Sequence, residues 1–103
     1  MNTQYVKRQS TVIEAFQLTR ETRRSNADWP SWMNKAWNLP RRKTNSLYPT
    51  IPNTSTGILS VMTQTGEHRV SFGDWIIRDD EGNLEKCGNH IFELTYKRVE
   101  SDA

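Results

Sequence analysis

The hydrophobic positions of residues 5–18 (YVKRQSTVIEAFQL) are rich in β-branched and aromatic side chains and are bounded by polar stretches, so they predict one strand or two short ones. Phe16 and Leu18 would lie on one face of such a strand and Ile13 on the other. Apolar residues on both faces are typical of a central strand. Glu14 is the exception in this pattern, and we expect it to pair with an Arg of a neighbouring strand or to lie at the rim of the sheet.

The next apolar residues recur at helical spacing. Five of them, separated by three or four positions, fall on one stripe of an α-helix: Trp29, Trp32, Met33, Ala36 and Trp37. Asp28 is the expected N-cap, and Pro30 is tolerated in the first turn because the amides there have no intrahelical acceptor. The helix should end near Asn38, before Pro40, with its tryptophan stripe facing the interior.

From residue 40 onward the periodicity is lost and then returns with a period of two. Residues 40–56 contain three prolines and predict an irregular, exposed excursion. Four short strands are expected at residues 57–64, 68–72, 75–79 and 83–87, joined by turns in antiparallel hairpins. His68 and Val70 alternate with Arg69 as in a half-buried strand, and a turn is expected at Gly73.

The last segment predicts a short helix over residues 89–96 with Asn89 as its cap, followed by a final strand or tail. The whole pattern predicts an α+β fold in a single domain, residues 1–103: a small antiparallel sheet, which could close into a barrel, packed with the Trp-rich helix and the short C-terminal helix. At this length we expect one hydrophobic core. Its predicted members are Phe16, Trp29, Trp32, Met33, Trp37, Trp75, Ile77, Phe92 and Tyr96.

Composition narrows the compartment and the cofactors. No apolar run is long enough to span a bilayer, and the first ten residues lack the apolar segment of a signal peptide, so we expect a soluble protein without membrane association. Cys87 is the single cysteine, which fits a reducing compartment. We expect no cofactor, because the five scattered glycines form no phosphate-binding motif.

Candidate catalytic or metal-binding chemistry is sparse. Cys87 and His90 have the spacing of half a zinc site, but only His68 and carboxylates could complete it, so we expect no metal. A helix start and His90 could also lower the pKa of Cys87 and make it a nucleophile, although no orienting acid is recognisable. For Cys87 we favour the alternative of a buried, inert thiol. Asp74 is interpreted as a turn residue, and no catalytic residue is predicted.

The charge distribution suggests a binding surface. Residues 1–43 carry nine Lys or Arg and three acidic residues, whereas residues 44–103 carry five and nine. Six basic residues flank the predicted tryptophan helix: Arg20, Arg23, Arg24, Arg41, Arg42 and Lys43. They could bind phosphates, with Tyr48 stacking on unpaired bases. Alternatively Leu47, Tyr48 and Ile51, beside these arginines, form a protein-binding surface, or else they fold back over the core.

Several segments resemble one family: VIEAFQLT, WPSWM, SLYPT, GDWII, a cysteine about ten residues later, and IFELTY. They are similar to small uncharacterised proteins of tailed phages and prophages. The resemblance implies expression in a bacterial cytoplasm and an accessory role, without an established activity. We therefore expect a non-catalytic protein that binds a host or phage protein, with nucleic-acid binding as the alternative and a thiol enzyme or hydrolase as the third. Pairing of exposed strand edges could also produce a homodimer.

Overall fold

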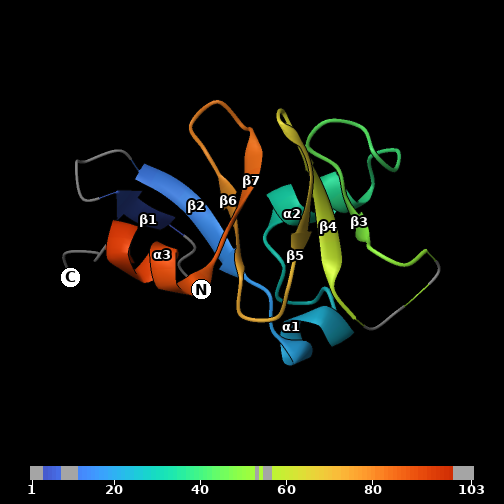
Figure 1. Ribbon diagram of the computed structural model, residues 1–103, viewed down its shortest axis with the longest axis horizontal. Coiled ribbons are helices and arrows are strands. Elements are labelled where there is room, and N and C mark those ends of the chain that lie inside the picture. Colours follow the sequence, from blue (N-terminus) through green and yellow to red (C-terminus); the bar gives the residue numbers. More distant parts are fainter. Residues whose placement is uncertain (1–3, 8–11, 53, 55–56, 99–103) are drawn as a thin grey trace.

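The computed structural model describes residues 4–7, 12–52, 54 and 57–98, which form two antiparallel sheets and three helices (Figure 1). In chain order the elements are β1 (Gln4–Lys7), β2 (Val12–Gln17), α1 (Arg20–Arg24), α2 (Ser31–Trp37), β3 (Leu47–Pro49), β4 (Leu59–Thr63), β5 (Gly66–Val70), β6 (Trp75–Arg78), β7 (Leu84–Cys87), α3 (Asn89–Thr95) and β8 (Tyr96–Arg98). The α+β prediction is confirmed. The sheets do not close into a barrel, so that alternative is wrong.

The five-stranded sheet has the order β7-β6-β2-β1-β8, which makes β2 its middle strand, as its two apolar faces predicted. The register places Glu14 opposite Arg78 of β6, and Nη1 of Arg78 lies 3.0 Å from Oε1 of Glu14. The expected cross-strand partner for Glu14 is therefore confirmed. Each half of the chain contributes strands to this sheet, so the charge difference between the halves does not become a difference between two surfaces.

Each face of this sheet carries its own hydrophobic cluster. Phe16, Leu18 and Ile76 point to the side of α2 and the three-stranded sheet. Ile13 and Ile77 point to the other side, where they pack with residues that include Phe92 of α3. The described residues thus form two clusters on either side of one sheet, rather than the single core that we expected.

The helix α2 begins later than predicted. Pro30 is its N-cap, so Asp28 does not cap the helix and Trp29 precedes it. Trp29 is nevertheless buried, and its Nε1 donates a hydrogen bond to the carbonyl of Thr22 at 2.7 Å. Met33 is fully buried, which contributes about 1.5–3 kcal/mol relative to an exposed side chain. The predicted stripe therefore does face the core, with Trp32 and Trp37 half-buried at its margins.

The structure also adds a helix that the sequence pattern did not predict, α1. Thr19 caps it: its Oγ1 accepts from the amide of Thr22 at 3.1 Å, and its own amide donates to Oγ1 of Thr22 at 2.8 Å. Such a reciprocal box satisfies amides that the first turn leaves open. Arg23 is the buried residue of this helix, which makes the segment part of the interior and not a solvated basic loop.

At the C-terminal end, Gly88 is the N-cap of α3, and Asn89 is its first residue rather than its cap. Oδ1 of Asn89 instead accepts a hydrogen bond from Nε1 of Trp75 at 2.9 Å. The ring of Trp75 stacks on Phe92 with centroids 3.9 Å apart. Of the predicted core, five residues are buried: Phe16, Trp29, Met33, Ile77 and Phe92. The other four are half-buried against the clusters: Trp32, Trp37, Trp75 and Tyr96.

The second sheet has the order β3-β4-β5 and lies to the right of the first in Figure 1. The predicted hairpins β4-β5 and β6-β7 are confirmed, and Gly73 has the positive φ (97°) expected at the turn between them. His68 is exposed on β5, so it does not belong to a half-buried face. The final strand is present as β8, which pairs with β1; residues 99–103 lie outside the described part.

Candidate functional site

The predicted irregular excursion contains a strand, β3, which pairs with β4 and places Tyr48 opposite Ser60. Leu47 and Tyr48 are buried as a result, so neither offers a free apolar surface to a partner. Their alternative interpretation, folding back over the core, is the one that the structure bears out. Ile51 follows the strand and differs from both, because 68% of its surface is exposed.

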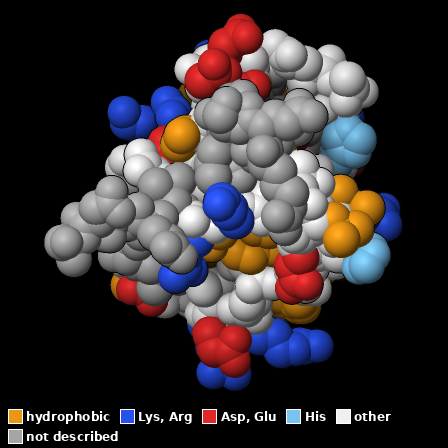
Figure 2. Space-filling model, turned by 90° about the vertical axis from the view of Figure 1, so that its left-hand side faces the viewer, with side chains coloured by type: hydrophobic (Ala, Val, Ile, Leu, Met, Phe, Trp, Pro, Cys, Tyr) orange, Lys and Arg blue, Asp and Glu red, His pale blue; other side chains and the backbone are white. Residues whose placement is uncertain are grey.

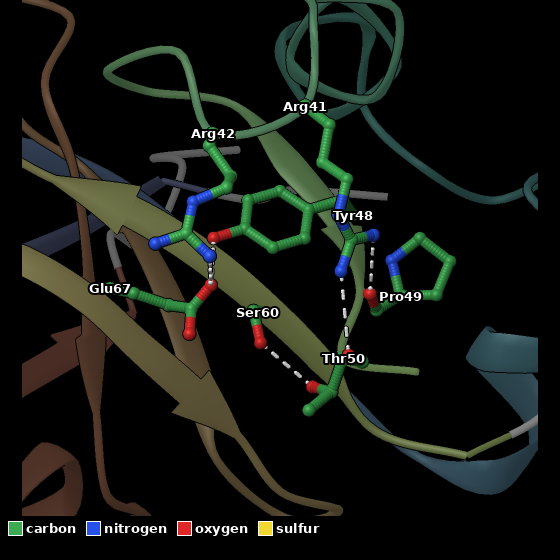
Figure 3. A network of polar contacts seen from close by, with 7 residues as sticks. All are labelled: Arg41, Arg42, Tyr48, Pro49, Thr50, Ser60 and Glu67. Carbon is green, nitrogen blue, oxygen red and sulfur yellow. Dashed lines mark hydrogen bonds and ion pairs between the residues drawn. The ribbon is translucent and has the colours of Figure 1, made fainter. Parts of the chain in front are cut away.

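Tyr48 is held between two arginines of the preceding loop (Figure 3). The guanidinium of Arg41 lies over its ring, 4.5 Å from the centroid, and donates to the carbonyls of Pro49 at 2.9 Å and Thr50 at 3.4 Å. The phenol donates to Oε2 of Glu67 on β5, which also lies 3.6 Å from Nη1 of Arg42. The loop before β3 is therefore attached to both β3 and β5 through its arginines.

This environment changes the acidity of Tyr48. Burial, together with the hydrogen bond to Glu67 and its negative charge, raises the pKa of the Tyr48 phenol to about 12. The phenol is therefore protonated at neutral pH and acts as a hydrogen-bond donor. It is a structural anchor for the loop and not a proton acceptor in a reaction.

Next to this network is a groove of about 410 Å³, which we name the proline groove. It is lined by Trp37, Leu39, Arg41, Leu47, Tyr48, Pro49, Pro52 and Thr54. Thr54 also lines the neighbouring hollow that contains Ile51, and its Oγ1 donates to the carbonyl of Ile51 at 2.7 Å. Thr54 is therefore shared by the proline groove and the hollow that contains the exposed Ile51.

The six predicted basic residues do not form one free cationic surface. Arg23 is buried, and its guanidinium donates to the carbonyls of Gly57 at 3.0 Å and Thr54 at 3.0 Å. Arg20 lies over the ring of Phe72. Arg24 is exposed, and Lys43 lines a different hollow from Arg41. Figure 2 shows the other end of the molecule, at β1 and α3, where described side chains of both charges are interspersed.

The candidate thiol site has the wrong electrostatics for a nucleophile. Burial raises the pKa of the Cys87 thiol, and the carboxylate of Glu85 raises it further. Sγ of Cys87 lies 3.6 Å from the carbonyl of Gly88, while His90 is exposed on α3. Among the described residues no group of three or more His, Cys, Asp or Glu could hold a metal ion. Asp74 is a turn residue, as interpreted: its Oδ2 accepts from the amide of Ser71 at 3.0 Å.

Sequence reasoning missed several residues of the groove and of the network beside it. Trp37 was assigned to the core alone, and no role was given to Leu39, Pro49, Pro52, Thr54 and Glu67. The cluster of prolines was the one available signal, because proline keeps a groove wall rigid without needing an amide partner. Pairing of β3 with β4, which brings these residues beside Trp37, depends on contacts distant in sequence.

Comparison with protein-family models, with curated proteins and with solved structures found no match. Within the described residues, no helix has the length and apolar character needed to cross a membrane. The geometry of the proline groove is therefore the basis for assigning a function.

Proposed function

We propose that this chain is a non-catalytic binding protein of a phage or prophage that binds a protein partner at the proline groove. The phage origin rests on the sequence resemblance. The observation that carries the binding role is the combination of a groove walled by Trp37, Pro49 and Pro52 with an arginine fixed at its side. Aromatic residues and arginine are the residue types enriched where binding energy is concentrated.

Arg41 indicates what the partner presents. Its hydrogen bonds to Pro49 and Thr50 use two of the five N–H donors of a guanidinium, so donors remain for a carboxylate. Because those bonds and the Tyr48 ring already hold the side chain, little rotamer entropy would be lost on binding. The partner segment is thus expected to carry an acidic residue next to an apolar one, which would contact the groove or Ile51.

Nucleic-acid binding stays the alternative prediction, with weaker support. Bases stack on open aromatic faces, but Tyr48 is buried beneath Arg41, and Arg23 lies over the ring of Trp37. Four of the six basic residues also contact groups of their own chain: Arg20, Arg23, Arg41 and Arg42. Fewer cationic groups are left to contact phosphates.

Affinity capture from a bacterial lysate, followed by titration of the captured partner, tests this proposal. Arg41→Gln and Ile51→Asp should each weaken binding about tenfold, which corresponds to ~1.4 kcal/mol. Arg24→Gln and Ile91→Asp make the same changes at exposed positions of α1 and α3, and should have no effect.

The two functions give different outcomes. A nucleic-acid binder would lose its ligand on nuclease treatment, would bind far more weakly at about 0.2 M salt, and would be weakened by Arg24→Gln. Capture that survives nuclease and the control variants but fails in the two groove variants supports protein binding. Equal binding by Ile51→Asp, Arg41→Gln and the unchanged protein would contradict the proposal.

A further inference from the structure

A second hollow shares one lining residue, Leu39, with the proline groove. It has a volume of about 460 Å³, within the range of sites that bind small molecules. Residues of α2, of the 39–45 segment, of β2, β6 and β7 and of the β6–β7 turn line it, so its walls come from six parts of the chain. We name it the charged cleft.

Cations predominate among its ionisable groups. Glu14 and Arg78, paired at 3.0 Å, line the cleft together with Lys35 of α2 and Lys43 of the 39–45 segment. Both lysines are exposed, and within the described part of the chain neither ammonium is in an ion pair. Since the ion pair with Glu14 offsets Arg78, the two lysines leave the cleft with a net positive charge that attracts an anion.

The remaining walls of the cleft are partly apolar. Trp32, Leu39 and Leu84 line it beside the lysines. The Nε1 atom of Trp32 is buried and has no hydrogen-bond acceptor among the described residues. A buried donor left unpaired costs about 1–3 kcal/mol, and because this atom is buried, a ligand could pair with it only if the Trp32 side chain moved.

We propose that the charged cleft binds a small organic anion, a flat apolar group that carries a carboxylate or a phosphate. The two ammonium groups of Lys35 and Lys43 bind the anionic end. The apolar part lies along the wall formed by Trp32, Leu39 and Leu84. This site is separate from the proline groove and does not depend on the proposed protein partner.

Calorimetric titration with two matched pairs of probes tests the proposal: adenosine 5′-monophosphate against adenosine, and 2-naphthoate against 2-naphthylmethanol. In each pair only one member carries the anionic group. At least one anion should bind, and about tenfold more tightly than its neutral partner, because the lysines contact the charge. If neither anion binds, or if the neutral compounds bind equally well, the proposal is wrong.

Matched variants locate the binding site. The double change Lys35→Ala and Lys43→Ala should weaken anion binding about tenfold, whereas Lys97→Ala, at an exposed position of β8, should leave it unchanged. Binding should also change the fluorescence of Trp32, so the signal should disappear in Trp32→Phe. A tenfold loss in Lys97→Ala, or an undiminished signal in Trp32→Phe, would place the anion elsewhere and overturn the proposal.

Discussion

At the scale of single residues, Tyr48 shows how one buried hydroxyl can link two segments. Its phenol donates to Glu67, and its ring supports the guanidinium of Arg41. The sequence placed this residue in a proline-rich stretch without periodicity, so its burial was one of two open interpretations. For Glu14 the sequence also left two interpretations open, an arginine of a neighbouring strand or a position at the rim of the sheet, and the pair with Arg78 bears out the first.

The raised pKa of Tyr48 gives a pH dependence with a defined sign. An ordinary tyrosine has a pKa near 10, and that of Tyr48 is raised to about 12 by burial and by Glu67. A folded-state pKa above the unfolded one means that the native state holds the proton more tightly. The stability that follows is fully present below about pH 10 and is lost as the pH rises toward about 12.

We predict that Tyr48→Phe lowers the free energy of unfolding by about 1 kcal/mol at neutral pH, because it removes the hydrogen bond to Glu67. In urea unfolding, the difference from the unchanged protein should narrow above about pH 10. Tyrosinate absorbance provides the independent check. In a pH titration, Tyr48→Phe should remove a tyrosine whose pKa lies well above the ordinary value of about 10. Its titration near pH 10 would contradict the assignment.

At the scale of elements, the sequence identified those that have apolar periodicity and missed those that do not. The stripe of α2 and the alternation of β4 to β7 predicted them, although the first turn of α2 was misplaced. Residues 20–24 have no apolar repeat, and their cap pairs Thr19 with Thr22 in place of the more recognisable Glu or Gln. β3 is short and forms only because β4 lies beside it.

Arg23 connects α1 to α2 and to the segment between β3 and β4, and this connection can be tested. Its guanidinium bonds the carbonyls of Thr54 and Gly57 and lies over Trp37, and burial lowers its pKa. We predict that Arg23→Lys lowers the free energy of unfolding by about 1–3 kcal/mol, because an ammonium cannot reproduce both bonds. Arg24→Lys, at the exposed neighbouring position, should change it by less than about 0.5 kcal/mol. Equal urea midpoints for the two variants would show that the hydrogen bonds of Arg23 do not stabilise the fold.

At the scale of the whole molecule, the central sheet belongs to both hydrophobic clusters. Ile76 and Ile77 are adjacent in β6 but lie in different clusters, so loss of this strand would dismantle both. The extents of 42 × 28 × 24 Å reflect this arrangement, in which α3 and the three-stranded sheet lie on either side of a shared layer. The sequence predicted the central strand but not two clusters, because length alone says nothing about how a core is divided.

We therefore predict a single cooperative unfolding transition. In a Trp75→Phe background, the remaining tryptophans lie on the α2 side, and their fluorescence reports that side alone. Adding Phe92→Leu on the α3 side should lower the urea midpoint, by about 1 kcal/mol in free energy, equally in this fluorescence and in far-ultraviolet circular dichroism. An unchanged fluorescence midpoint would mean that the two sides unfold independently.

The alternation of side chains in β2 also limits how the chain can change in length. A shift of one residue in a strand moves the shifted side chains to the opposite face, so a one-residue deletion between Ile13 and Phe16 would send either Phe16 toward α3 or Ile13 toward α2. The turn between β6 and β7, residues 79–83, contributes no side chain to either hydrophobic cluster. Natural variants of this chain should therefore gain or lose residues at that turn, while β2 keeps its length of six.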